Sequence, residues 1–263
     1  MGRIGTLLLV ALGIASSSTL LAQSSGCTNG SFNGVFALSL SGVVVPGLPI
    51  SGDFARLGRV VADGLGNTTA TTQANYNGLI LEEDFSGSYT VADNCAVTWN
   101  VTIPTGPLNV TISGVILNSG QRLMLFISNP GGAVIFGNLE RQQTGCTTAS
   151  LNGGYALRLN GHIEVGLPLT GPFSRNGQIV FDGAGNAAVA NSVASYSGAV
   201  LREIYPGTYT IDSTCAFTWQ GTEPYPILVP VTIQGILSED GSHAYLMEVS
   251  PGGTVITGEM TLQ

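Results

Sequence analysis

Gly52-Asp-Phe54-Ala-Arg56-Leu-Gly58, followed by Asp63-Gly-Leu-Gly-Asn67, recurs as Gly171-Pro-Phe173-Ser-Arg175-Asn-Gly177, followed by Asp182-Gly-Ala-Gly-Asn186. Outward from these motifs, Cys27-Thr28, Asn33-Gly34 and Gly47-Leu48-Pro49 recur as Cys146-Thr147, Asn152-Gly153 and Gly166-Leu167-Pro168. The repeated unit is far longer than the period of roughly 20–50 residues that marks solenoids and propellers. The sequence therefore predicts a duplicated domain, and residues kept in both copies are candidates for shared architecture or a shared site.

The chain has 263 residues, of which only 9% are charged. All eight basic residues are Arg, and with 16 acids the net charge is -8. This balance argues against a nucleic acid or an anionic membrane surface as a partner. The mean hydropathy is positive, at +0.33, yet beyond the N-terminus no apolar segment reaches the roughly 18–20 residues that a spanning helix needs. We expect a soluble body without an integral membrane span in the mature chain.

The N-terminus has the pattern of a secretory signal peptide over residues 1–22, with Arg3, an apolar stretch over residues 7–14 and a cleavage site after Ala22. Ser25-Gly-Cys27 also allows a lipoprotein signal, but Cys27 has an internal counterpart in Cys146. No signal peptidase acts at that internal position, so a structural role for both cysteines is the simpler interpretation. The predicted location is secreted, or periplasmic and in the cell envelope.

The expected domains are residues 23–142 and 143–263, each the size of an ordinary domain. The copies meet near residues 141–145, a connection too short for a flexible tether, so we expect the two domains to touch. The four cysteines divide two to a copy and allow three pairings. Duplication favours Cys27–Cys95 and Cys146–Cys215, because each domain closed its own bridge before it was copied. A metal site made from these cysteines is not expected, since there is no CxxC spacing.

Short β-rich runs, separated by Gly, Asn, Asp or Pro, dominate both copies and predict an all-β fold. Side chains alternate along them, as in Phe36, Leu38 and Leu40 against Ser39 and Ser41. Two tandem antiparallel barrels of eight or nine strands each explain the pattern best, because closure removes exposed strand edges. Two β-sandwiches are the alternative. An outer-membrane barrel made from both copies is disfavoured by short strands and few aromatic residues. The first copy's strands are expected at residues 35–44, 58–63, 68–76, 78–83, 87–92, 96–103, 108–117, 122–128 and 133–140, and the second copy's at 155–163, 177–182, 187–196, 198–203, 207–212, 216–221, 227–237, 243–249 and 254–262.

The Asp-Gly-x-Gly-Asn motifs resemble calcium loops at first sight. A Ca²⁺ site takes six to eight oxygen ligands, usually with several carboxylates, whereas each motif offers one Asp and one Asn. Between strands, Asp-Gly and Gly-Asn provide the positive φ angles of a hairpin turn. The motifs therefore predict turns, and we expect no metal site.

Polar and aromatic residues kept in both copies are the candidates for a site. Arg56 and Arg175 are kept although arginine is scarce, and Glu83 and Glu203 are kept at strand ends. They form either an Arg–Glu pair in a barrel mouth that binds a polar group, or a structural ion pair or unrelated surface charges. The kept aromatics are core residues or the walls of a cavity. The candidate ligand-binding residues are Arg56, Tyr76, Tyr89, Trp99, Arg175, Tyr196, Tyr209 and Trp219.

The usual catalytic sets are missing from the sequence. His162 and His243 align with Val43 and Arg122, so no histidine mechanism is common to both copies. There is no GxSxG elbow, no HExxH and no Gly-rich phosphate loop. Only a lone Glu83 or Glu203, with a pKa raised inside an apolar barrel, is left as a weak catalytic candidate. No cofactor is predicted.

Residues 27–34 (Cys-Thr-Asn-Gly-Ser-Phe-Asn-Gly), the turn at 63–67 and residues 87–95 (Gly-Ser-Tyr-Thr-Val-Ala-Asp-Asn-Cys), with their second-copy equivalents, resemble exported bacterial proteins of the broad allene oxide cyclase-like group of small β-barrels. The resemblance covers nearly the whole mature chain. It implies a barrel fold, and relatives of that barrel include cyclases and isomerases that work by shaping an apolar cavity. It assigns no catalytic residue.

Three functions follow as expectations. The first is a secreted, non-catalytic barrel that binds a small apolar or glycan-like ligand, or that is an envelope or matrix component. The second is a cyclase or isomerase, which needs a cavity of at least about 300 Å³ holding Glu83 or Glu203 with the kept tyrosines. The third is a surface adhesin or self-assembling protein, suggested by low charge and β content.

Overall fold

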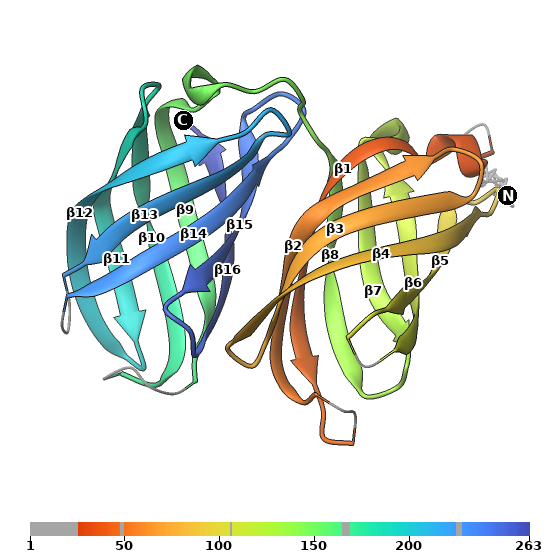
Figure 1. The fold of residues 1–263 in the computed structure, drawn as a ribbon, viewed down its shortest axis with the longest axis horizontal. Coiled ribbons are helices and arrows are strands. Elements are labelled where there is room, and N and C mark those ends of the chain that lie inside the picture. The colour runs from red at the N-terminus through yellow and green to blue at the C-terminus, as the bar shows by residue number, and fades with distance from the viewer. Residues whose placement is uncertain (1–25, 48–49, 106, 165–168, 225–227) are drawn as a thin grey trace, which may run out of the picture.

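The computed structural model describes residues 26–47, 50–105, 107–164, 169–224 and 228–263. The predicted signal peptide and its cleavage site lie outside these residues. The chain forms two closed antiparallel barrels, and in each of them every strand pairs with its neighbours in sequence and the last strand pairs with the first. Figure 1 shows the two barrels side by side. The predicted tandem barrels are confirmed.

Each barrel has eight strands. The first contains β1 (Asn33–Val44), β2 (Gly52–Asp63), β3 (Asn67–Tyr76), β4 (Leu79–Val91), β5 (Ala96–Ile103), β6 (Leu108–Leu117), β7 (Arg122–Asn129) and β8 (Ala133–Arg141). The second contains β9 (Asn152–Ile163), β10 (Gly171–Asp182), β11 (Asn186–Tyr196), β12 (Ala199–Ile211), β13 (Ala216–Glu223), β14 (Val229–Leu237), β15 (His243–Ser250) and β16 (Thr254–Leu262). Three short 3₁₀ turns, η1 (Asn29–Ser31), η2 (Asn118–Gly120) and η3 (Thr148–Ser150), complete the described elements.

Eight strands agree with the expected eight or nine, but two of the nine segments expected in each copy join into one strand. Residues 78–83 and 87–92 form one continuous strand, β4, and their counterparts form β12. Gly87, expected at the start of a separate strand, lies within β4, and its missing side chain leaves room for the Trp99 ring, whose Nε1 lies 2.7 Å from where a Cβ would be. Strands β2 and β10 also begin six residues earlier than expected, at Gly52 and Gly171.

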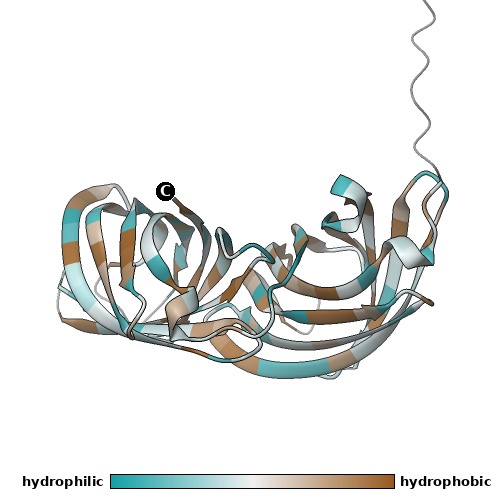
Figure 2. Cartoon of the chain, turned by 90° about the horizontal axis from the view of Figure 1, so that it is seen from above, coloured by the Kyte–Doolittle hydropathy of each residue, from teal (hydrophilic) through white to brown (hydrophobic). Residues whose placement is uncertain are grey.

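The predicted alternation places one face of each strand inside its barrel. Phe36, Leu38 and Leu40 are buried, while Ser39 on the opposite face is partly exposed. Bands of hydrophobic and hydrophilic residues accordingly alternate along the strands (Figure 2). Each barrel thus has its own apolar core, continuous around the closed sheet.

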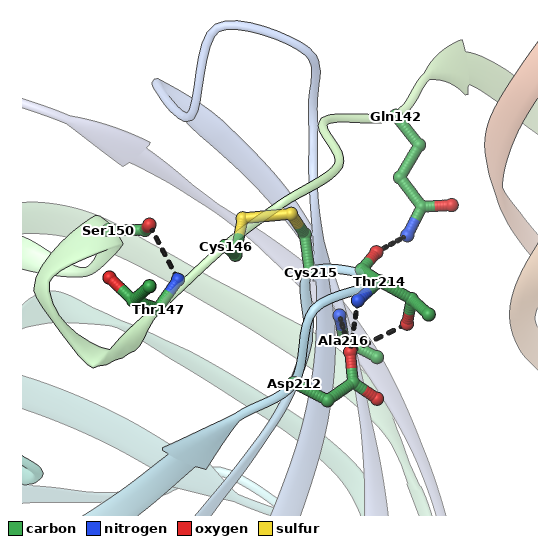
Figure 3. The surroundings of a disulfide bond; sticks show 8 residues. All are labelled: Gln142, Cys146, Thr147, Ser150, Asp212, Thr214, Cys215 and Ala216. Carbon is green, nitrogen blue, oxygen red and sulfur yellow. Dashed lines mark hydrogen bonds between the residues drawn. A yellow bond between two sulfur atoms is a disulfide. The ribbon is translucent and has the colours of Figure 1, made fainter.

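One disulfide fastens each barrel near its first strand, as duplication predicts. Cys27 pairs with Cys95, with Cα atoms 4.9 Å apart, and Cys146 pairs with Cys215, with Cα atoms 5.1 Å apart. Figure 3 shows the second bridge beside the turn in which the Asp212 carboxylate accepts hydrogen bonds from Thr214 and Ala216. The bridge therefore joins the start of the second copy to the turn between β12 and β13.

The two barrels touch, as their short connection predicts. The outer faces of β1 and β2 pack against the outer faces of β14, β15 and β16. Gln142, in the connection, pairs with Ser238 and its side-chain amide donates to the Thr214 carbonyl (Figure 3). The buried residues of this contact are Ala37, Ala55 and Leu57 from the first barrel and Ile236, Tyr245, Met247 and Val255 from the second. Among the described residues, no helix is long and apolar enough to cross a membrane.

Candidate functional site

A buried Arg–Tyr–Glu cluster lies inside the first barrel. Arg56 of β2, Tyr76 of β3 and Glu83 of β4 are all on inward-facing positions of adjacent strands. Arg56 is 4% exposed and Glu83 is 2% exposed, so neither is a surface charge. Arg56 Nη2 donates to the Glu83 carboxylate and, at 2.9 Å, to the Tyr76 hydroxyl. The Tyr76 hydroxyl in turn lies 3.0 Å from Glu83 Oε2. Three of the sequence-predicted site residues thus meet at one point.

The pKa of Tyr76 reflects this position. Burial raises the pKa of the Tyr76 phenol to about 12, the nearby Arg56 charge opposes the rise and the Glu83 carboxylate adds to it. Tyr76 therefore stays protonated at neutral pH and keeps a hydroxyl that donates and accepts at the same time. The cluster is therefore an Arg56–Glu83 ion pair hydrogen-bonded to a neutral phenol.

The second barrel repeats the cluster and enlarges it. Arg175 Nη2 donates to the Tyr196 hydroxyl at 2.9 Å and to the Glu203 carboxylate, as in the first barrel. Two further groups join it. Arg175 Nη1 donates to the Tyr205 hydroxyl at 2.7 Å, and Arg175 Nη2 also pairs with the carboxylate of Glu223. This arginine is therefore held by two carboxylates and two phenols. Burial raises the pKa values of both phenols, although the Arg175 charge opposes it.

Sequence comparison missed Glu223, Tyr205 and a third buried acid, Glu248. Each stands where the first copy has an apolar residue, Ile103, Phe85 and Ile127 respectively, so a search for shared residues passes over them. Burial raises the pKa of Glu248 to about 7, against the opposing effects of a Thr254 hydrogen bond and the Arg175 charge. In sequence, each of these residues is recognisable as an acid or a tyrosine at an inward-facing position of a strand in which buried and exposed residues alternate.

The other kept aromatics lie apart from the clusters. The Tyr89 hydroxyl donates to the carbonyl of Phe32 at 2.6 Å, and the Tyr209 hydroxyl donates to that of Leu151 at 2.8 Å. They fasten the 3₁₀ turns η1 and η3 to the barrels. Trp99 and Trp219 are fully buried core residues, and the Trp99 indole donates to Thr68. Their proposed roles in ligand binding gain no support from this placement.

The Asp-Gly-x-Gly-Asn motifs are turns in both barrels. One oxygen of Asp63 accepts from the backbone N–H groups of Leu65, Gly66 and Asn67, and the other accepts from the Asn67 side chain. The Asn67 side-chain hydrogen bond, helped by the backbone ones, lowers the pKa of Asp63 to about 2. The carboxylate is therefore already engaged by its own turn.

The two histidines lie at the contact between the barrels, each between two acids. His162 Nδ1 is 3.8 Å from Asp53 of the first barrel and 3.1 Å from Glu164. His243 Nδ1 is 3.1 Å from Glu140 of the first barrel, and its Nε2 is 3.5 Å from Glu259. The two histidines, which the copies do not share, thus lie where the two barrels meet.

An apolar cavity lies between the Arg56 cluster and one end of the first barrel. At this end the chain passes from β1 to β2, from β3 to β4, from β5 to β6 and from β7 to β8. The volume of the cavity is about 80 Å³, which is room for about three water molecules at their share of liquid volume. Arg56 and Tyr76 are among its walls, so polar donors lie at the inner end of an otherwise apolar space. The apolar walls include Val44, Phe54, Ile103, Leu108, Ile127 and Ile135.

The fold and the site together define a class: a tandem β-barrel protein with a buried Arg–Tyr–Glu cluster in each barrel. No protein-family model matches the sequence, and no curated protein matches it either. Two solved structures are similar in shape: isotype 1 transferrin binding protein B of serogroup B Neisseria meningitidis, and a mutant of transferrin binding protein B from Haemophilus parasuis Hp5. The first has a TM-score of 0.35 and 7% identity, covering 87% of this chain and 76% of that chain. The second has a TM-score of 0.29 and 8% identity, covering 86% and 75%. At such scores the likeness carries no functional argument.

Proposed function

We propose that this chain is a non-catalytic binding protein, exported from the cytoplasm, whose first barrel takes a small, largely apolar ligand at its open end. The cavity above Arg56 carries the proposal, because it combines apolar walls with polar donors at its inner end. Ligand sites generally combine apolar walls with a few polar groups in this way, but this cavity of about 80 Å³ is smaller than the usual pocket of about 300–1,000 Å³. The predicted leader and the two disulfides support export.

The ligand is slender, or it extends out of the barrel. A cavity of about 80 Å³ holds only a small group, so the rest of a larger ligand lies along the rim near Ile50 and Pro130, which also line the opening. A thermal-shift screen of the purified mature chain with lipids and glycans tests the proposal. We expect slender apolar compounds to stabilise the first barrel. The absence of any stabilising compound, lipid or glycan, would leave only an envelope or matrix role.

A cyclase or isomerase of the allene oxide cyclase-like group is supported less well. Such an enzyme needs a chamber of at least about 300 Å³, and the cavity above Arg56 is smaller. The Glu83 carboxylate is also occupied by Arg56 and Tyr76.

A specific observation favours self-association as a second candidate function. Phe126 of β7 and Phe136 of β8 pair side by side on the outside of the first barrel and are 53% and 61% exposed, with exposed Met124 and Val134 beside them. The equivalent face of the second barrel is the one that packs against the first. Sedimentation analysis at high concentration tests this: we expect a dimer that Phe126→Ser dissociates, and a strict monomer would remove this candidate.

A further inference from the structure

The two buried arginines have unequal sets of partners. Arg175 uses Nη1 for Tyr205 and Nη2 for Tyr196, Glu203 and Glu223. Among the described residues, Arg56 donates hydrogen bonds only from Nη2, to Tyr76 and Glu83. Arg56 therefore has one carboxylate and one phenol fewer than its counterpart.

Two differences between the copies cause this. Phe85 stands in place of Tyr205, and the Arg56 guanidinium lies over its ring at 5.2 Å instead of donating to a hydroxyl. Ile103 stands in place of Glu223 and forms part of the cavity wall. Arginine stays charged in proteins, and a buried N–H without an acceptor is costly. Arg56 itself lines the apolar cavity, so that cavity lies beside an arginine with fewer internal partners than Arg175.

We propose that the ligand of the first barrel is an aliphatic carboxylate, and that its head group binds Arg56 in the place that the Glu223 carboxylate occupies in the second barrel. This inference rests on the proposed binding function and names the chemical class of its ligand. Arg56 and Glu83 neutralise each other, so a bound carboxylate leaves one net negative charge on the cluster. The second barrel carries that same set of charges on Arg175, Glu203 and Glu223, which shows that the architecture accommodates it.

The cavity walls fit the rest of such a ligand. An alkyl chain attached to the carboxylate passes between Val44, Ile103 and Ile127 and leaves the barrel near Ile50. Each buried methylene adds favourable apolar burial, while a guanidinium binds a carboxylate through paired, charge-assisted hydrogen bonds. Arginine thus selects the head group and the walls select the chain.

Isothermal titration of the full mature chain with octanoate, octanol and methyl octanoate tests the inference. We expect octanoate to bind with one site per chain and the two uncharged analogues to bind at least tenfold more weakly. If the analogues bind as well as octanoate, the head-group inference is overturned while the binding function stands. If none of the three binds, the proposed function fails with it.

Reciprocal variants separate the inference from general effects on folding. Ile103→Glu supplies the first barrel with an internal carboxylate and should weaken octanoate binding at least tenfold. Glu223→Ile, the matched change in the second barrel, should leave octanoate binding in the first barrel unchanged. Phe85→Tyr adds only a hydroxyl as partner for Arg56, and should weaken binding even if Ile103→Glu fails to fold. Unchanged octanoate affinity in a folded Ile103→Glu or Phe85→Tyr variant would contradict the proposal.

Discussion

Replacing Glu248 by Gln should change how the stability of the second barrel depends on pH. Glu248 is buried on β15, with 5% of its surface exposed, and burial raises its pKa from 4.5 to about 7. Between pH 4.5 and about 7, such a carboxyl group therefore binds more protons in the folded state than in the unfolded state. Stability is therefore lost as the pH rises from about 4.5, and the loss is complete only above the folded pKa.

The size of the effect follows from the shift. A rise of about 2.5 pKa units corresponds to about 3 kcal/mol of destabilisation above pH 7. Gln has nearly the same shape and does not ionise in this range. We expect Glu248→Gln to match the wild type near pH 4.5 and to exceed it by up to about 3 kcal/mol near pH 8.

Urea unfolding of the second barrel between pH 4.5 and 8, followed through its own transition, provides the measurement. Glu239→Gln is the matched control, since Glu239 is exposed and its loss should leave the pH dependence unchanged. A Glu248→Gln variant with the same pH dependence as the wild type would refute the assignment of Glu248 as a buried acid that titrates near neutrality.

Three further outcomes are expected. Arg175→Met leaves two buried carboxylates without their cation and should cost about 3–5 kcal/mol in urea unfolding, more than Arg56→Met, which leaves one; equal losses would contradict the partner sets. Burial lowers the pKa of His243, but its pairing with Glu140 outweighs this effect and the pKa is raised overall. The loss of stability caused by His243→Gln should therefore be greatest near pH 6 and vanish by pH 9. A loss of stability that persists at pH 9 would speak against the ion pair. Reduction of the disulfide of the second barrel, which closes a loop across a sequence separation of 69 residues, should cost about 4 kcal/mol; an unchanged unfolding midpoint would show that the bridge contributes nothing.

The sequence predicts the two barrels and the two disulfides because these depend on features that duplication preserves, and it predicts the contact between the barrels because the connection between the copies is short. Alternating residues such as Phe36 and Leu38 determine which face is buried, and paired cysteines determine the bridges. It wrongly places a strand break between residues 83 and 87, because Gly87 makes room for a tryptophan on a neighbouring strand instead of marking the start of a new strand. A glycine that follows a turn and one that accommodates a distant ring look the same in sequence.

All three members of the first cluster and three of the five in the second are predictable for the same reason, since Tyr76 and Tyr196 are also kept in both copies. Arg56 with Glu83, and Arg175 with Glu203, emerge from a comparison of the copies, and the structure places each pair in contact. Glu223 does not emerge, because it replaces an isoleucine and meets Arg175 only when β13 lies across the barrel from β10. The difference between the barrels, on which ligand selection depends, is therefore visible only in three dimensions.

The most direct test of the account is a crystal structure of the mature chain grown with octanoate. We expect the carboxylate on Arg56 inside the first barrel, with the alkyl chain between Ile103 and Ile127, and no second molecule on Arg175. Octanoate bound to Arg175, or bound outside the barrels with the cavity above Arg56 unchanged, would contradict it.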